Sequence, residues 1–258
     1  MSGHSKWSQI KRKKGVADAR RGQMFTRLGR EIMVAVREGG PDTDGNFRLR
    51  VAVERARREG MPVDNIQRAI DRASGRGGEA QVEEVAYEGY APHGVALVVL
   101  AATDNRNRCV AEVRNALTRG GGSLGETGCV SWLFDIKGYL AVDVPGEEDD
   151  EKEAKGEEMA LEVMDVEGVE DVRVSGDTVD VYTEMVDLGR VRARLLEMGL
   201  SISAAERTYL PKTVMTLDVR DTVQVLRLID RLEELEDVQK TFSNLEVTDE
   251  AAAAYEES

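Results

Sequence analysis

The 258-residue chain has few of the residues that build disulfide frameworks and metal sites. It contains two cysteines, Cys109 and Cys129, and two histidines, His4 and His93. Two cysteines cannot form a disulfide network, and no Cys and His cluster has the spacing of a zinc site. We therefore expect no metal and no bound cofactor.

The chain also lacks a long apolar segment. Its longest uninterrupted run, residues 94–102, is far shorter than the roughly 20 residues that span a membrane, so it predicts a buried strand. The N-terminal region is basic, but no apolar stretch follows it as in a secretory signal. These observations predict a cytoplasmic protein with no membrane partner.

Several common catalytic motifs are absent as well. The sequence contains no G-x-x-x-x-G-K-[ST], H-E-x-x-H or C-x-x-C segment, and among 49 acidic residues a pair of carboxylates is uninformative. The spacing G-x-G-x-x-G occurs at Gly120, Gly122 and Gly125, but between a predicted helix and a predicted strand, the reverse of the order in dinucleotide sites. We predict a protein that is not an enzyme and has no small-molecule substrate, the strongest enzymatic alternative being a Mg²⁺-dependent nuclease.

What the sequence does have is charge of both signs in different places. Residues 1–78 hold 18 Lys and Arg against 9 Asp and Glu, a net charge of +9, whereas residues 79–258 have a net charge of -23. A basic segment on an acidic body directs one surface toward polyanions. We expect the acidic clusters at 147–153 and 233–237 to be solvated; the alternatives are binding of basic protein tails or keeping the body off nucleic acid.

Helical patterns fill the basic segment. Residues 19–40 repeat apolar side chains at helical spacing and place Arg20, Arg27, Arg30 and Arg37 on the opposite arc, and further helices are predicted over residues 46–59 and 62–73. The Gly-rich stretch at residues 74–80 predicts a linker. Residues 1–78 are thus expected to form a basic arm followed by a small helical domain.

Beyond residue 80, strands alternate with helices. A strand pair is expected on either side of the turn at residues 92–94. The order from the strand at 138–144, through a solvated acidic loop at 145–158 that passes into a helix, to the strand at 201–210 spells βαββαβ, which is the ferredoxin-like arrangement. The flanking segments predict a second such unit, with strands at 94–103, 128–134, 213–218 and 237–247 and helices at 107–119 and 222–235.

The predicted fold is therefore α+β and multidomain: a small N-terminal helical bundle followed by two ferredoxin-like domains, one inserted in the other. The expected boundaries are 1–78 for the arm and helical domain, 79–134 with 207–248 for the discontinuous domain, and 135–206 for the inserted one. Residues 249–258 are expected to be a frayed tail.

The basic arm is the first candidate nucleic-acid contact. Its cations can neutralise phosphates, and Trp7 offers a flat face for stacking on an unpaired base, the alternative being that it anchors the arm to the helical domain. Exposed arginines of the predicted helices extend this surface. The candidate residues are His4, Lys6, Trp7, Lys11, Arg12, Lys13, Lys14, Arg20, Arg21, Arg27, Arg68 and Arg72.

A second candidate contact is the segment TDNRNR at residues 103–108, between a predicted strand and a predicted helix. Asp104 or Asn105 would serve as the N-cap, and free backbone N–H groups there favour an anion. Capping does not account for the neighbouring arginines. The candidate contact residues are Asn105, Arg106, Asn107 and Arg108.

These residues also resemble a known family. GHSKW at 3–7, the spacing R-x-G-x-x-F-x-x-L-x-R-E-I ending at Ile32, MPxDNIxRAI at 61–70, YEGYxPxGVA at 87–96, TDNRNR at 103–108 and GGxLGxxG at 121–128 together resemble the YebC family, bacterial relatives of the mitochondrial translational activator of cytochrome c oxidase. Departures are Cys109 and Cys129, where Thr and Ser are expected, and Ala91 and His93 in a turn.

The resemblance implies a helical N-terminus with two α+β domains and a role in gene expression without chemistry. The family has been labelled as probable DNA-binding transcriptional regulators, and other members resemble ribosome-associated factors that assist translation through consecutive prolines. A short basic end on an acidic body favours a translation factor that contacts rRNA or tRNA. The alternatives are a transcriptional regulator on promoter DNA and a protein-interaction scaffold.

Overall fold

The computed structural model describes residues 18–76, 82–146 and 149–256. Its first part is a helical unit of α2 (Asp18–Gly39), α3 (Phe47–Arg58) and α4 (Val63–Asp71), followed by one π-helical turn η1 (Arg72–Arg76). The apolar stripes of α2, α3 and α4 face one another around the buried Ile32, Leu49 and Ile66. Asn46 caps α3, because its side chain accepts the Leu49 N–H while its amide donates to Ala35 O and Gly40 O.

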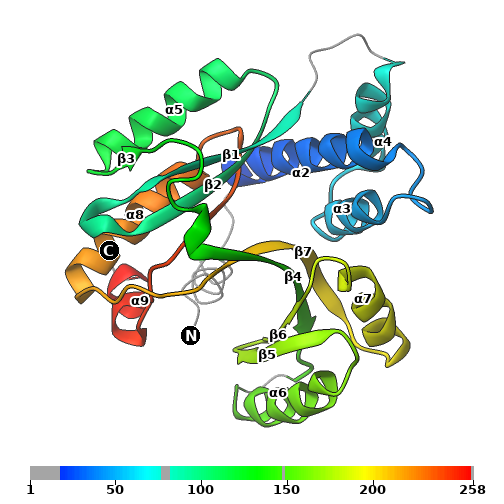
Figure 1. The fold of residues 1–258 in the computed structure, drawn as a ribbon. Helices are drawn as coiled ribbons and strands as arrows, with labels where there is room; N and C mark the ends of the chain where they lie inside the picture. The colour runs from blue at the N-terminus through cyan, green and yellow to red at the C-terminus, as the bar shows by residue number, and fades with distance from the viewer. Residues whose placement is uncertain (1–17, 77–81, 147–148, 257–258) are drawn as a thin grey trace.

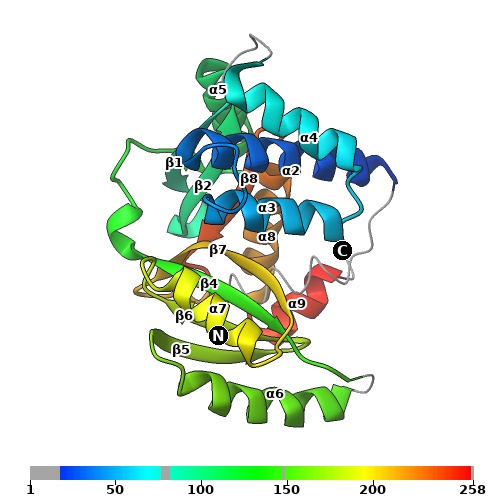
Figure 2. The same ribbon diagram turned by 90° about the vertical axis from the view of Figure 1, so that its right-hand side faces the viewer.

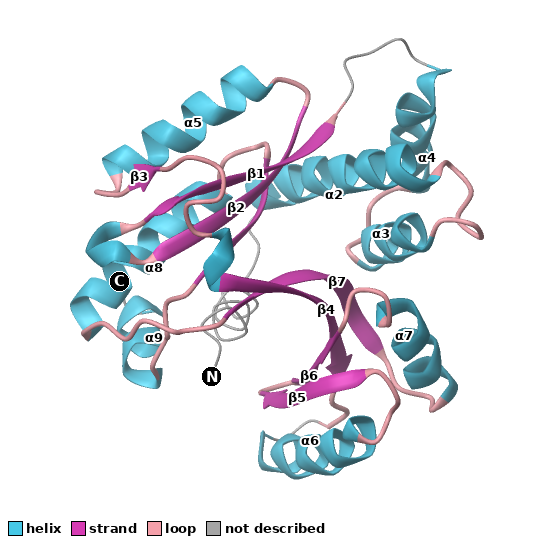
Figure 3. Cartoon of the chain, in the orientation of Figure 1, coloured by secondary structure: helices cyan, strands magenta, loops and turns pink. Residues whose placement is uncertain are grey.

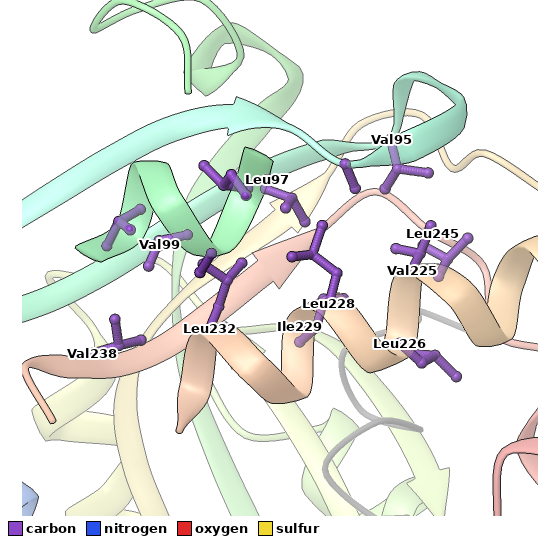
Figure 4. Packing of buried hydrophobic residues seen from close by; sticks show 14 of the residues in the cluster. Val95, Leu97, Val99, Val225, Leu226, Leu228, Ile229, Leu232, Val238 and Leu245 are labelled. Atoms are coloured by element: carbon purple, nitrogen blue, oxygen red, sulfur yellow. The ribbon is translucent and has the colours of Figure 1, made fainter. Parts of the chain in front are cut away.

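The first sheet is antiparallel, with the strand order β3-β1-β2-β8. Its strands are β1 (Glu83–Tyr90), β2 (Ala96–Thr103), β3 (Ser123–Leu124) and β8 (Val238–Ser243). Helices α5 (Arg106–Arg119) and α8 (Val219–Glu233) cover one face, where β2 residues such as Leu97 pack on Leu117 and Leu228 (Figure 4). The tight turn η2 (Pro92–Gly94) joins β1 to β2.

The other face of this sheet contacts the rest of the molecule. Ala102 packs on Val34 of α2, and Val98 belongs to a cluster with Phe134 and Tyr209 from the second sheet. Both faces of β2 are therefore covered, which agrees with its continuous apolar sequence.

The second sheet is also antiparallel and has the order β5-β6-β4-β7. It is built from β4 (Phe134–Asp143), α6 (Asp149–Met164), β5 (Val169–Ser175), β6 (Thr178–Thr183), α7 (Leu188–Glu197) and β7 (Ile202–Pro211). This order and connectivity are those of the ferredoxin-like fold. Helices α6 and α7 bury one face around Leu140 and Val181, and the unit occupies the lower half of Figures 1 and 2.

The first sheet differs from its predicted topology. Residues 128–134 were expected to form a strand, but they contain the 3₁₀ turn η3 (Ser131–Leu133), and residues 213–218 contribute a single bridge from Met215 to Leu245. Strand β1 pairs along β2 instead, in the place that the ferredoxin-like pattern assigns to residues 213–218 (Figure 3). The pairing of β1 with β2 around the turn at residues 92–94 confirms the predicted strand pair, but the ferredoxin-like pattern had left β1 outside the order of this sheet.

Two other sequence expectations are wrong. The acidic stretch before residue 157 was expected to be a loop, but α6 already begins at Asp149. The tail expected to be frayed forms α9 (Asp249–Glu256), in which Ala251, Ala252 and Tyr255 are buried against the first sheet's helical layer. None of the helices in the described ranges is both long enough and apolar enough to cross a membrane.

Candidate nucleic-acid interface

Most of the predicted arm lies outside the described residues. This applies to His4, Lys6, Trp7, Lys11, Arg12, Lys13 and Lys14. Arg20 and Arg21 fall in the first turn of α2, and their side chains are likewise not described. The structure therefore locates Arg27, Arg68, Arg72 and the segment at residues 105–108.

Arg68 and Arg72 lie on one exposed face, because they are four residues apart across α4 and the start of η1. The Arg68 guanidinium donates to Asn65 Oδ1 at 3.3 Å. Both arginines border a hollow of about 430 Å³ between α2, α4 and the end of β2, whose lining also includes Asp104 and Glu236. Of the segment at residues 103–108, only Asp104 lines this hollow, and the predicted contact residues 105–108 are not part of its lining.

That segment begins α5 with the predicted cap. Asn105 is the N-cap, its Oδ1 accepting the Arg108 N–H at 3.1 Å, while Thr103 Oγ1 accepts the Asn105 N–H at 3.0 Å. Asn107 is exposed. Arg106 forms an ion pair with Glu83, with 2.9 Å between Nη2 and Oε2.

Arg108 extends inward from this segment to Asp237, which is only 1% exposed. Arg108 Nη2 lies 2.9 Å from Asp237 Oδ2 and also 2.9 Å from Asp104 Oδ1. The hydrogen bond to Asp237 and its negative charge raise the pKa of Arg108 above its usual value. Arg108 therefore stabilises the fold at this position whatever else it contacts.

Asp237 also binds Thr103 and Arg30. Its Oδ2 accepts the Thr103 hydroxyl at 2.7 Å, and Arg30 Nη1 lies 2.8 Å from its Oδ1. Arg30 was predicted on the outer arc of α2, but it is 8% exposed and also pairs with Glu236. The outer arc of α2 faces the turn before β8, so this part of the helical pattern describes contact with another domain and not with solvent.

Arg27 is on the same arc and is half-buried. Burial lowers its pKa, and the nearby Glu233 and Glu234 oppose that shift. The Arg27 side chain therefore lies beside acids of α8, an arrangement that favours an internal electrostatic role over contact with phosphate.

Further ion pairs join the helical unit to the domains of the two sheets. Glu84 of β1 accepts hydrogen bonds from Arg48 of α3 and from Arg207 of β7. Arg192 of α7 reaches Glu54 of α3 at 2.5 Å. Part of the positive charge of the helical unit thus holds the domains together, which composition alone did not reveal.

The glycine-rich loop between α5 and β4 is folded around a buried carboxylate. Glu88, 6% exposed, accepts the N–H groups of Gly128, Val130 and Ser131, each at 2.8 Å. Burial alone would raise the pKa of Glu88, but these three donors hold it below its usual range. The backbone donors that could have received a phosphate are bound to Glu88.

The same loop contains G-x-S-x-G at residues 121–125, a spacing also found at nucleophilic serines. Here it leads from α5 into β3, whereas a nucleophile elbow leads from a strand into a helix. Within the described ranges, no group of three or more His, Cys, Asp and Glu side chains is placed to hold a metal ion.

Comparison with known proteins gives consistent matches along the chain. Residues 5–76 match a family model described as the TACO1/YebC protein N-terminal domain, and residues 82–245 match one described as the TACO1/YebC second and third domain. A protein of Herpetosiphon aurantiacus named "Probable transcriptional regulatory protein" is 54% identical over 257 residues, covering 100% of this chain and 99% of the relative.

A second relative and a solved structure agree with these matches. A Roseiflexus castenholzii protein of the same name is 51% identical, covering 99% of each chain. The crystal structure of the conserved hypothetical protein Aq1575 from Aquifex aeolicus is similar with a TM-score of 0.81 and 43% identity, covering 90% of this chain and 93% of that one.

Proposed function

The chain belongs to the TACO1/YebC family, and on that premise we propose that it is a non-enzymatic regulator of gene expression that binds nucleic acid. The contacts are made by the basic arm and by Arg68 and Arg72. The observation that carries this proposal is the exposed pair on α4 and η1, beside the hollow shared with the segment at 103–108. Arg30 and Arg48, elsewhere in the helical unit, form ion pairs with carboxylates.

The names of the relatives favour DNA as the target and transcription as the regulated process. Cationic side chains bind phosphate without reading sequence, so we expect the affinity to fall steeply with salt. Asn65 and Arg68 lie on the exposed side of α4 and are residue types that read bases in the major groove.

A second candidate function is a translation factor on the ribosome. The net charge of -23 on residues 79–258 supports it, because an acidic body disfavours wrapping by free duplex DNA. On the ribosome, where a bound protein is surrounded by RNA, the short basic arm can contact rRNA or tRNA.

One experiment separates the two candidates. The intact chain and a chain lacking residues 1–17 are tested for retention on duplex DNA and for co-sedimentation with ribosomes, each at low and moderate salt. Arm-dependent DNA binding without ribosome association supports the transcriptional regulator, and ribosome association that survives moderate salt supports the translation factor. Unchanged affinity of the truncated chain for both would contradict the role of the arm.

A second experiment tests Arg68 and Arg72. Arg68→Ala with Arg72→Ala should lower the affinity and reduce the slope of log K against log salt by about 0.9 for each B-DNA phosphate that the variant no longer neutralises. Arg114→Ala with Arg119→Ala is the matched control, since it removes the same charge from the exposed side of α5. Equal effects of the two pairs would assign the weaker binding to net charge and reject α4 as a contact.

A further inference from the structure

A cavity of about 1170 Å³ lies where the helical unit meets the two sheets. Part of its wall is apolar, with Met24 from α2, Phe47 from α3, Leu188 from α7 and Phe242 from β8. Such a wall favours an occupant that brings apolar side chains.

The charged groups around the cavity are mainly acidic. Eight carboxylates line it against five Arg and Lys side chains. Glu59 and Glu234 are exposed, and neither has a cationic nitrogen within 4.0 Å in the described part of the chain. An excess of negative charge repels nucleic acid and attracts a basic occupant.

Three residues of the cavity wall also carry buried hydrogen-bond donors that lack acceptors. Arg27 Nε, Arg207 Nε and Gln239 Nε2 are buried atoms of lining residues, and no described atom accepts from them. Buried donors of this kind require acceptors. All three nitrogen atoms are closed off from solvent, so they do not face the space of the cavity and do not select its occupant.

We propose that the chain's own basic arm, residues 1–17, binds in this cavity when nucleic acid is absent and is displaced when nucleic acid binds. The arm combines five Lys and Arg residues with Trp7 and Ile10, which matches an acidic rim and an apolar wall. Lys14 precedes Asp18 by four residues, a distance of at most about 14 Å. Helix α2 itself lines the cavity at Gln23 and Met24, so the arm starts near its site.

This proposal rests on the proposed function, because it makes the cavity a competitor for the arm that contacts nucleic acid. The first measurement needs no nucleic acid. Trp132→Phe leaves Trp7 as the only tryptophan of the full chain. The emission of Trp7 should then lie at shorter wavelength, and be quenched less by acrylamide, than that of a free peptide of residues 1–17.

The charge of the rim is tested by Glu59→Lys with Glu234→Lys in the same background. This pair should move the Trp7 emission to that of the free peptide. The control is Glu157→Lys with Glu158→Lys, an identical charge change on exposed positions of α6 outside the cavity. Should the Glu59/Glu234 pair fail to fold, raising the salt concentration on the Trp132→Phe chain should produce the same shift, because screening weakens the attraction.

The competition is tested with duplex DNA and with RNA. If the arm is docked nine-tenths of the time, releasing it raises the apparent affinity for nucleic acid about tenfold. The Glu59→Lys/Glu234→Lys variant should therefore bind nucleic acid about tenfold more tightly than the Glu157→Lys/Glu158→Lys control. Trp7 emission equal to that of the free peptide in the unsubstituted cavity would overturn the proposal. So would emission that varies with protein concentration, which would place the arm of a second copy in the cavity. If deleting the arm left nucleic-acid affinity unchanged while Trp7 stayed shielded from acrylamide, the proposed function would be rejected and the docking of the arm would stand.

Discussion

At the scale of single residues, Asp237 connects parts of the chain that are distant in sequence. Its buried carboxylate accepts hydrogen bonds from Thr103 and Arg108 and forms an ion pair with Arg30. An ionised group at 1% exposure requires partners of this kind, because burial without them costs several kcal/mol. Asp237 therefore ties α2 to the end of β2 and the start of α5.

Replacing this carboxylate should be strongly destabilising. We expect Asp237→Asn to lower the free energy of unfolding by about 3–5 kcal/mol, because two arginines lose a buried partner. Asp104→Asn is the control, since Asp104 binds Arg108 at an exposed position and such pairs contribute up to about 1 kcal/mol. Urea unfolding measures both, and equal losses would contradict the special role of Asp237.

Glu88 gives a pH-dependent prediction. Its pKa in the folded chain is below that in the unfolded chain, so it stabilises the fold above the unfolded pKa, and this stabilisation is lost as the pH falls through the folded pKa. Glu88→Gln should therefore lower the melting temperature at neutral pH, and the difference from the unsubstituted chain should shrink between about pH 5 and pH 3.

The control for Glu88 is Glu126→Gln, an exposed acid in the same loop. It should leave the melting temperature nearly unchanged at every pH. A Glu88→Gln difference that stays constant from neutral to acid pH would show that the loop depends on the shape of the side chain and not on its charge.

At the scale of elements, α9 is where local sequence and tertiary structure disagree most. Four alanines favour a helix by propensity, but the position near the end of the sequence predicted fraying. Tyr255 is nevertheless 3% exposed, and its hydroxyl donates to Asp230 at 2.7 Å. Contact with α8 therefore orders the segment, because an isolated helix of this length is unstable in water.

Truncating this side chain tests the contact. Tyr255→Ala should destabilise the chain by about 3 kcal/mol, in the range for removal of a buried aromatic ring. Glu256→Ala changes the exposed neighbour and should have an effect within about 0.5 kcal/mol. Equal melting temperatures of the two variants would contradict the packing of α9 and support the frayed tail predicted from sequence.

At the scale of the whole molecule, Glu84 joins all three units. It lies on β1 of the first sheet and accepts hydrogen bonds from Arg48 of the helical unit and from Arg207 of the second sheet. Burial by itself would raise the pKa of Glu84, but the two guanidinium groups hold it below the usual value. Its charge is therefore part of what sets the arrangement of the domains.

Removing that charge should loosen the arrangement. We expect Glu84→Gln to increase the radius of gyration in small-angle X-ray scattering and to speed proteolysis between the units, with secondary structure retained. Glu83→Gln is the neighbouring control, because Glu83 pairs with Arg106 within a single unit. An unchanged radius for Glu84→Gln would assign the arrangement to the apolar contacts of Val98, Phe134 and Tyr209.

The sequence by itself determined the local structure and the family. Apolar periodicity located the helices of the basic segment, because side-chain spacing reports which residues share a face. Sequence patterns also located the strands of the second sheet, whereas the strands predicted at 128–134 and 213–218 did not form. Residue type and position limited the N-cap of the helix after β2 to Asp104 or Asn105, and the structure shows that it is Asn105. The motifs from residue 3 to residue 128 indicated the family that the comparisons show.

Only the tertiary structure decided what each face meets. Arg27 and Arg30 lie on the polar arc of α2, which sequence reasoning assigns to solvent, but α8 and the turn before β8 cover that arc. The place of β1 in the order of the sheet, the order in α9 and the burial of Asp237 depend on segments far away in the chain. Periodicity defines a surface, whereas its environment depends on the element that packs against it.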